Sequence, residues 1–103
     1  MNRVEILKQL KAIIQDILNE NIELDESMLI KSRSQGHESL ELSSLDVIGL
    51  VVKVEKTFEV EIADSEIATI YDVKSLIDLV ISAKKDMEKE IKEIEKIKEA
   101  IFA

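Results

Sequence analysis

Two adjacent serines, Ser43 and Ser44, stand just before a strongly apolar stretch, and their position suggests chemistry. A serine hydroxyl can act as a nucleophile, cap a helix or carry a covalently attached group. Hydrolysis is disfavoured, because the single histidine, His37, lies in a polar segment and no glycine-rich elbow surrounds either serine. No cysteine is present, and no His/Cys cluster suggests a metal site. Taken alone, the serine pair fits a helix cap best.

The segments before the serines divide into a helix and a loop. Over residues 3–18 the apolar side chains recur at helical spacing, and Asn2 with Glu5 forms a plausible capping pair. Residues 19–43 are polar and irregular, so we expect a long ordered loop there.

The segments after the serines are predicted to be helical as well. A second helix is expected at 44–58, with apolar residues on nearly every side, followed by a short helix at about 64–69. Asp72 resembles the N-cap of a last helix, which then meets no Gly or Pro as far as residue 103. The sequence therefore predicts an all-α four-helix bundle with three main helices and one short helix.

The net charge of the chain and the lengths of its apolar runs limit the binding partners and the location that we expect. The formal net charge is −8, which disfavours nucleic acid and anionic membranes and favours basic protein partners. The first residues lack the apolar core of a signal peptide, and no apolar run is long enough to span a bilayer. We therefore expect a cytoplasmic protein without membrane insertion.

The stretch Leu42-Ser43-Ser44-Leu45-Asp46 resembles the modification site of acyl carrier proteins, in which a serine is followed by leucine and an acidic residue. The match continues without a gap through residues 54–64 and 70–73, and it is clear over about residues 39–81. The tripeptide alone is a weak signal, whereas the ungapped spacing is a strong one.

The resemblance implies a function and a set of residues. It implies that Ser44 carries 4'-phosphopantetheine, derived from coenzyme A, and that the chain holds acyl intermediates as thioesters without being an enzyme. The implied partners are a phosphopantetheinyl transferase and acyl-transferring or acyl-modifying enzymes of fatty-acid, lipid or secondary-metabolite biosynthesis, with basic docking surfaces. The residues expected to contribute to partner recognition are Ser43, Leu45, Asp46, Val47, Val52 and Glu55.

Several residues depart from the family pattern. Ser43 replaces an aspartate that helps the modifying transferase, and Glu41 replaces a glycine, so the local turn is expected to differ. Gly49 stands where a recognition glutamate is common, and Lys53 and Lys56 add basic charge to a helix that is usually acidic. These differences predict a specialised carrier with a changed set of partners.

The C-terminal segment is the largest departure, and we divide the chain into a carrier-like domain at 1–82 and a helical extension at 83–103. The extension is electrically neutral, so the net charge lies in residues 1–81. Three roles fit it: packing on its own domain, docking a dedicated partner, or dimerising. A monomer is expected, because a strict heptad places Lys84 and Lys98 in the seam of a dimer. The apolar stripe of this segment consists of Met87, Ile91, Ile94, Ile97 and Ile101.

Two alternatives to an acyl carrier stay open at this point. An aminoacyl or peptidyl carrier shares the arm, although such carriers are often less acidic and sit inside longer chains. A degenerate interaction module keeps the fold and lacks the arm, and Ser43 gives that alternative some weight.

Overall fold

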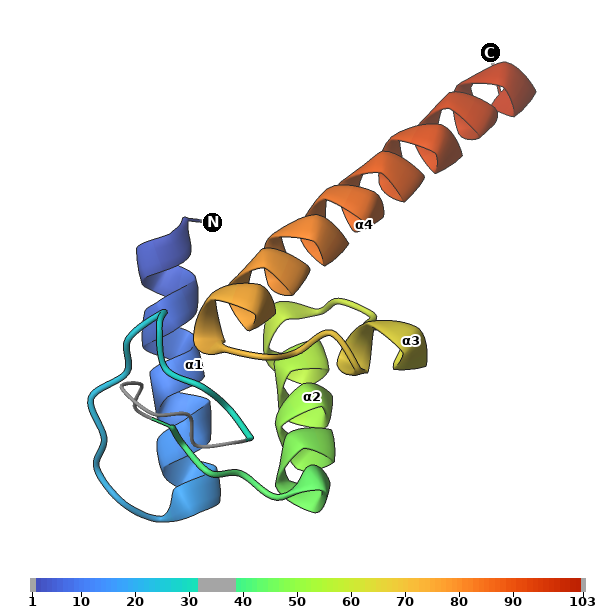
Figure 1. The fold of residues 1–103 in the computed structure, drawn as a ribbon. Helices are drawn as coiled ribbons and strands as arrows, with labels where there is room; N and C mark the ends of the chain where they lie inside the picture. Colours follow the sequence, from blue (N-terminus) through green and yellow to red (C-terminus); the bar gives the residue numbers. More distant parts are fainter. Residues whose placement is uncertain (1, 32–38, 103) are drawn as a thin grey trace.

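Four helices in the described part of the chain form the fold, in the order α1 (Arg3–Leu18), α2 (Ser44–Phe58), α3 (Asp64–Ile67) and α4 (Val73–Phe102) (Figure 1). The computed structural model describes residues 2–31 and 39–102, so His37 lies outside the described residues. The described residues form no strand, and the all-α bundle with three main helices and one short helix is confirmed.

The predicted capping residues mark the helix starts. The Glu5 N–H donates to Asn2 Oδ1 at 2.9 Å before α1. Before α4, the Ser75 N–H donates to Asp72 Oδ1 at 2.8 Å, and the Asp72 N–H donates to Ser75 Oγ at 3.1 Å. These bonds satisfy amide groups that have no partner inside the helix. α3 covers four residues, which is shorter than the 64–69 predicted for it.

The core lies between α1, α2 and the first turns of α4, and the loop after α1 contributes to it. Every fully buried side chain in the described residues is apolar. Burial of these side chains provides the main driving force for folding. The largest of them are Ile6, Leu10, Ile14, Ile30, Val47, Leu50, Val54, Phe58, Val73, Leu76, Ile77 and Val80.

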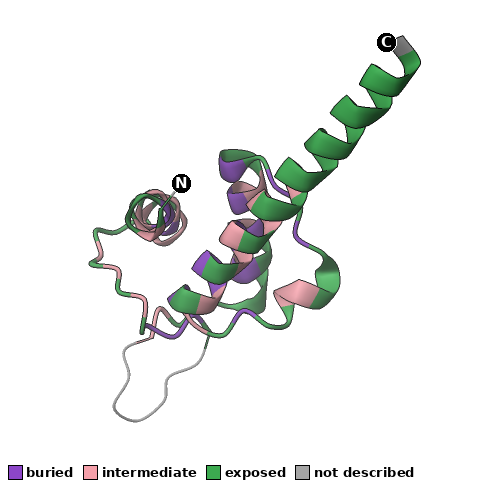
Figure 2. Ribbon diagram, turned by 90° about the horizontal axis from the view of Figure 1, so that it is seen from above, coloured by how far each residue is buried: buried purple, intermediate pink, exposed green. Residues whose placement is uncertain are grey.

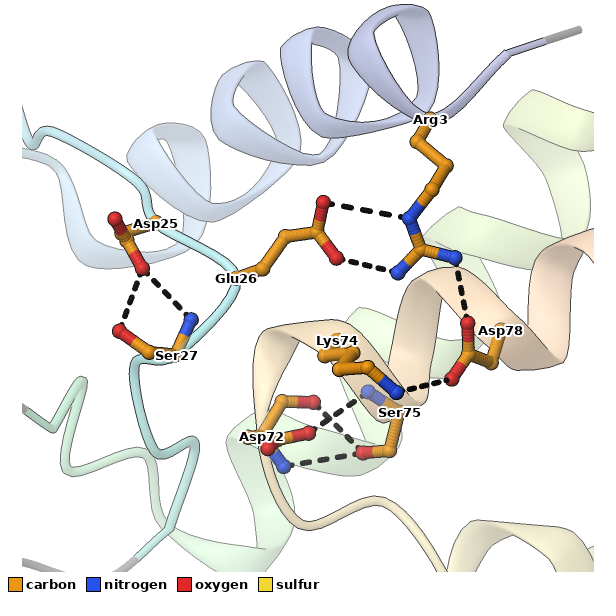
Figure 3. Close-up of polar contacts among 8 residues, drawn as sticks. All are labelled: Arg3, Asp25, Glu26, Ser27, Asp72, Lys74, Ser75 and Asp78. Atoms are coloured by element: carbon orange, nitrogen blue, oxygen red, sulfur yellow. Dashed lines mark hydrogen bonds and ion pairs between the residues drawn. The ribbon is translucent and has the colours of Figure 1, made fainter.

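Arg3 of α1 forms hydrogen bonds to the loop after α1 and to α4 at the edge of this core (Figure 3). Its Nε donates to Glu26 Oε2 at 3.3 Å in the loop, and one terminal nitrogen donates to the other Glu26 oxygen. Its second terminal nitrogen donates to Asp78 Oδ1 on α4 at 2.6 Å. The hydrogen bond from Arg3 holds the pKa of Asp78 below its ordinary value. Since these groups are partly exposed, the contacts fix positions more than they add stability.

The second half of α4 leaves the body of the protein (Figures 1 and 2). Residues 88–101 are all exposed, and at about 1.5 Å per residue they extend the helix by about 21 Å. The molecule therefore measures 59 × 25 × 21 Å. The prediction that the extension packs on its own domain, one of the three roles considered above, is therefore wrong for residues 88–101, whereas Ala83 does pack against the core. The division at residue 82 stays a prediction, and α4 passes through that position without a break.

Candidate functional site

The segment that leads to the two serines is held against the preceding loop. The Leu40 N–H donates to the Leu29 carbonyl at 2.8 Å, and the Leu42 N–H donates to the Ile30 carbonyl at 2.9 Å. Between these anchors Glu41 has a φ of 52°, in the left-handed region that favours glycine. Glu41 therefore adopts the backbone conformation that would suit a glycine, the residue usual at this position in the family pattern. Because glutamate has a Cβ, this conformation costs it more free energy than it would cost glycine.

Ser43 caps α2 through a reciprocal pair of hydrogen bonds. The Asp46 N–H donates to Ser43 Oγ at 3.1 Å, and the Ser43 N–H donates to Asp46 Oδ2 at 3.2 Å. This arrangement is a capping box, and it places the Asp46 carboxylate in the first turn, where the helix dipole favours negative charge. The helix cap expected from the serine pair is therefore formed by Ser43.

Ser44 is the first residue of α2, and its side chain is exposed. Its hydroxyl makes no hydrogen bond to any other described residue. The backbone N–H groups of Ser44 and Leu45 belong to the first turn, where no helical carbonyl is available to them. A phosphate attached here is favoured by such amide groups and by the helix dipole. The site therefore fits a phosphodiester on the Ser44 oxygen.

An apolar ridge runs down the exposed side of α2 from the serine. It consists of Leu45, Ile48 and Val52, which are 77%, 53% and 44% exposed. Their spacing of three and four residues places them on one face of the helix. Leu45 and Val52 were expected to face partners, whereas Ile48 was missed. Its spacing from Leu45 and Val52 was the sequence signal that could have identified it.

Val47 is not part of this surface. The side chain is 1% exposed and belongs to the core, so the prediction that it contacts partner enzymes is wrong. The physical reason is that Val47 shares the inner face of α2 with Leu50, Val54 and Phe58, at spacings of three and four residues.

The charged groups of α2 are partly engaged within the protein. Glu55 Oε2 accepts a hydrogen bond from the Ile62 N–H at 3.3 Å, which ties the segment after α2 back to the helix. Lys53 forms a hydrogen-bonded ion pair with Asp16 of α1, and the hydrogen bond from Lys53 lowers the pKa of Asp16. The positive charge of Lys53 is therefore balanced locally, while Lys56 is exposed.

Gly49 lies on α2 with open space around it, because a Cβ built on it meets no atom within 4 Å. Packing does not require a glycine at this position.

Comparison with known proteins agrees with this geometry. The phosphopantetheine attachment site family matches residues 8–80. An acyl carrier protein of Rubrobacter xylanophilus is 36% identical over 81 residues, which cover 79% of this chain and 94% of the relative. An acyl carrier protein of Thermosynechococcus vestitus is 34% identical over 80 residues, covering 78% and 93%.

A solved structure agrees as well. The crystal structure of an acyl carrier protein from Thermotoga maritima superimposes with a TM-score of 0.69 at 31% identity, covering 84% of this chain and 95% of that one. The fold and the family match over residues 8–80 define a helical carrier domain of the phosphopantetheine attachment site family. The chain belongs to the acyl carrier protein family, and 4'-phosphopantetheine is its covalent cofactor.

Two further findings bear on the expectations from the sequence. Among the described residues, no group of three or more His, Cys, Asp or Glu side chains is arranged to hold a metal ion. No helix in the described residues is long and apolar enough to cross a membrane. A cytoplasmic location stays a prediction.

Proposed function

We propose that Ser44 carries the phosphopantetheine arm, and that the chain presents acyl thioesters to partner enzymes without catalysing a reaction itself. One observation supports this most strongly: Ser43 performs the capping, so the cap explains one serine of the pair and not the other. Ser44 is left with an exposed hydroxyl at the start of α2, inside the segment that matches the family.

The surface next to Ser44 suits the partners of such a carrier. The apolar ridge of Leu45, Ile48 and Val52 starts one residue after Ser44. The carboxylates of Asp46 and Glu55 on the same helix are partly exposed, so they supply negative charge near the ridge. An apolar surface with acidic neighbours fits a basic enzyme surface by charge complementarity. The proposed partners are a phosphopantetheinyl transferase and acyl-transferring or acyl-modifying enzymes.

Intact-mass spectrometry tests the attachment directly. After incubation with a phosphopantetheinyl transferase and coenzyme A, we expect a mass gain of roughly 340 Da, the mass of the arm. Ser44→Ala removes the gain, whereas Ser43→Ala keeps it. No mass gain in the unchanged protein would favour an interaction module without the arm, and a gain that is lost in Ser43→Ala would move the site by one residue.

The residues around the site favour a specialised partner set. Gly49 provides no carboxylate, Ser43 replaces a charged residue, and Lys56 adds an exposed positive charge to the presenting helix. We expect poor turnover of the loaded protein by general fatty-acid synthesis enzymes, and improved turnover after Gly49→Glu. Gly49→Gln is the matched control, because it adds similar volume without charge. Normal turnover of the unchanged protein by all of these enzymes would refute the specialised role.

A further inference from the structure

The exposed half of α4 has an apolar stripe that begins at the half-buried Met87, and no part of the described chain covers its remaining residues. We define the tail stripe as Met87, Ile91, Ile94, Ile97 and Ile101, which recur at spacings of three and four residues. Its four isoleucines are between 50% and 67% exposed. Contiguous apolar surface of this kind marks interaction sites in soluble proteins.

Acidic residues border the tail stripe on both sides. With about 3.6 residues per turn, one border carries Asp86 and Glu93, and the other carries Glu88, Glu95 and Glu99. Glu90 lies at the edge of the stripe itself, at nearly the same angular position as Ile97. Most of the lysines lie on the face opposite the stripe, at positions 85, 89, 92 and 96. The charges of this neutral segment are therefore sorted by face.

This sorting argues against a second copy of the chain as the partner. In a parallel pair of helices each border meets the other border of the partner, and in an antiparallel pair each border meets its own copy. Both arrangements bring carboxylates against carboxylates, which is unfavourable. Lys98 also lies within the stripe, where its ammonium interrupts the apolar seam of a self-pair.

The same sorting argues against a membrane. Helices that lie on membranes carry Lys and Arg beside their apolar face, where they meet anionic lipid. Here the two borders of the stripe carry mostly carboxylates, and four of the six lysines of this segment lie on the opposite face. The complementary surface is an apolar helix or groove bordered by Lys or Arg side chains.

We infer that the tail stripe is a docking site for a protein partner with an apolar surface bordered by basic residues. The partner contacts the stripe with apolar side chains while its cations meet the two acidic borders. This site is separate from the arm and holds whether or not Ser44 is modified.

A pair of synthetic helical peptides tests the inference on the full chain. Both peptides carry leucine at the a and d positions. One peptide has lysine at the flanking e and g positions, and its twin has glutamate at the same positions. Fluorescence anisotropy is expected to show at least about tenfold tighter binding of the lysine peptide, with a preference that narrows as salt is added.

Variants assign the binding to the stripe rather than to the acidic body. The double variant Ile91→Gln/Ile94→Gln weakens binding of the lysine peptide about tenfold or more, since it removes apolar contacts without breaking the exposed helix. Glu90→Lys/Glu95→Lys removes the preference between the twins. Lys89→Gln on the opposite face is the matched control and leaves the affinity within about twofold.

Several results would overturn the inference. They are equal binding of the twin peptides, no binding of the lysine peptide, or unchanged binding in Ile91→Gln/Ile94→Gln. Sedimentation that shows a dimer, lost in the same double variant, would assign the stripe to self-association instead. Binding of the chain to phosphatidylcholine vesicles through these isoleucines would assign it to a lipid surface.

Discussion

Alanine substitution of the two adjacent serines is expected to separate their roles. Ser43→Ala removes the hydroxyl that accepts the Asp46 N–H at 3.1 Å, while the reverse bond to the Asp46 carboxylate can persist. Loss of an N-cap side chain costs typically about 1 kcal/mol of the free energy of unfolding. Ser44→Ala removes a hydroxyl without a partner in the described chain and adds the best helix former, so a gain of a few tenths of a kcal/mol is expected.

The assay pairs unfolding with mass measurement. Urea titration followed by far-ultraviolet circular dichroism is expected to give midpoints in the order Ser44→Ala, unchanged protein, Ser43→Ala. In thermal unfolding a difference of about 1 kcal/mol corresponds to roughly 4–8 °C for a domain of this size. Incubation with transferase and coenzyme A is expected to modify Ser43→Ala and not Ser44→Ala.

The reverse pattern would refute this reasoning. If Ser44→Ala were the destabilising variant and Ser43→Ala lost the mass gain, the capping geometry at the start of α2 would be shifted by one residue. If neither variant changed stability, the capping box would carry no energy, and it could not explain why the chain has a serine at position 43.

Three further predictions concern stability. Gly49→Ala is expected to raise the free energy of unfolding by up to about 1 kcal/mol, because alanine favours a helix and the added Cβ meets no atom within 4 Å; an unchanged urea midpoint would contradict this. Val47→Ala is expected to cost about 2 kcal/mol, because it empties a buried site, while Val52→Ala stays within about 0.5 kcal/mol; equal effects in urea titration would contradict the assignment of faces. The pKa of Asp78 is lowered by its hydrogen bond from Arg3, so its stabilising contribution is present above the ordinary pKa and is lost as pH falls through the lower folded pKa. The urea midpoint of Asp78→Asn is accordingly expected to fall less steeply below about pH 4 than that of the unchanged protein.

Local signals predicted most of the fold. α1 and α2 begin and end at the predicted residues, because a side chain at each start can accept an amide hydrogen bond and apolar residues then recur at helical spacing. The same signals identified Asp72 before α4. These interactions join residues within one helical turn, so their effect can be inferred without knowing the rest of the structure.

The orientation of α2 could not be inferred in the same way. Apolar residues occur on nearly every side of this helix, so periodicity alone left two candidate inner faces. The inner face contains Val47, Leu50 and Val54, and the outer ridge contains Leu45 and Ile48. Contacts with α1 and α4 decide between the faces, and those contacts depend on residues far away in the sequence. Val47 was therefore assigned to the wrong face.

The direction of α4 after residue 87 is a second feature that the sequence left open. Its helical periodicity was clear, but periodicity does not indicate what covers the apolar face. In the structure the body ends before the helix does, and residues 88–101 continue into solvent. The left-handed φ of Glu41 is another feature that the sequence left open, because the anchored segments on either side of Glu41 impose that conformation.

The ridge beside Ser44 on α2 and the tail stripe on α4 are placed so that a partner bound to one does not block the other. α2 begins at the end of the body that lies away from the α4 extension (Figure 1). A partner that binds the tail stripe therefore leaves Ser44 and the ridge beside it accessible to a second protein. α4 runs without a break from the core at Val73 to the stripe, so the stripe is held on a helix that is anchored in the bundle. A carrier bound to its partner through the tail would raise the effective concentration of the arm near that partner, and a weak interaction at α2 would then be enough for acyl transfer.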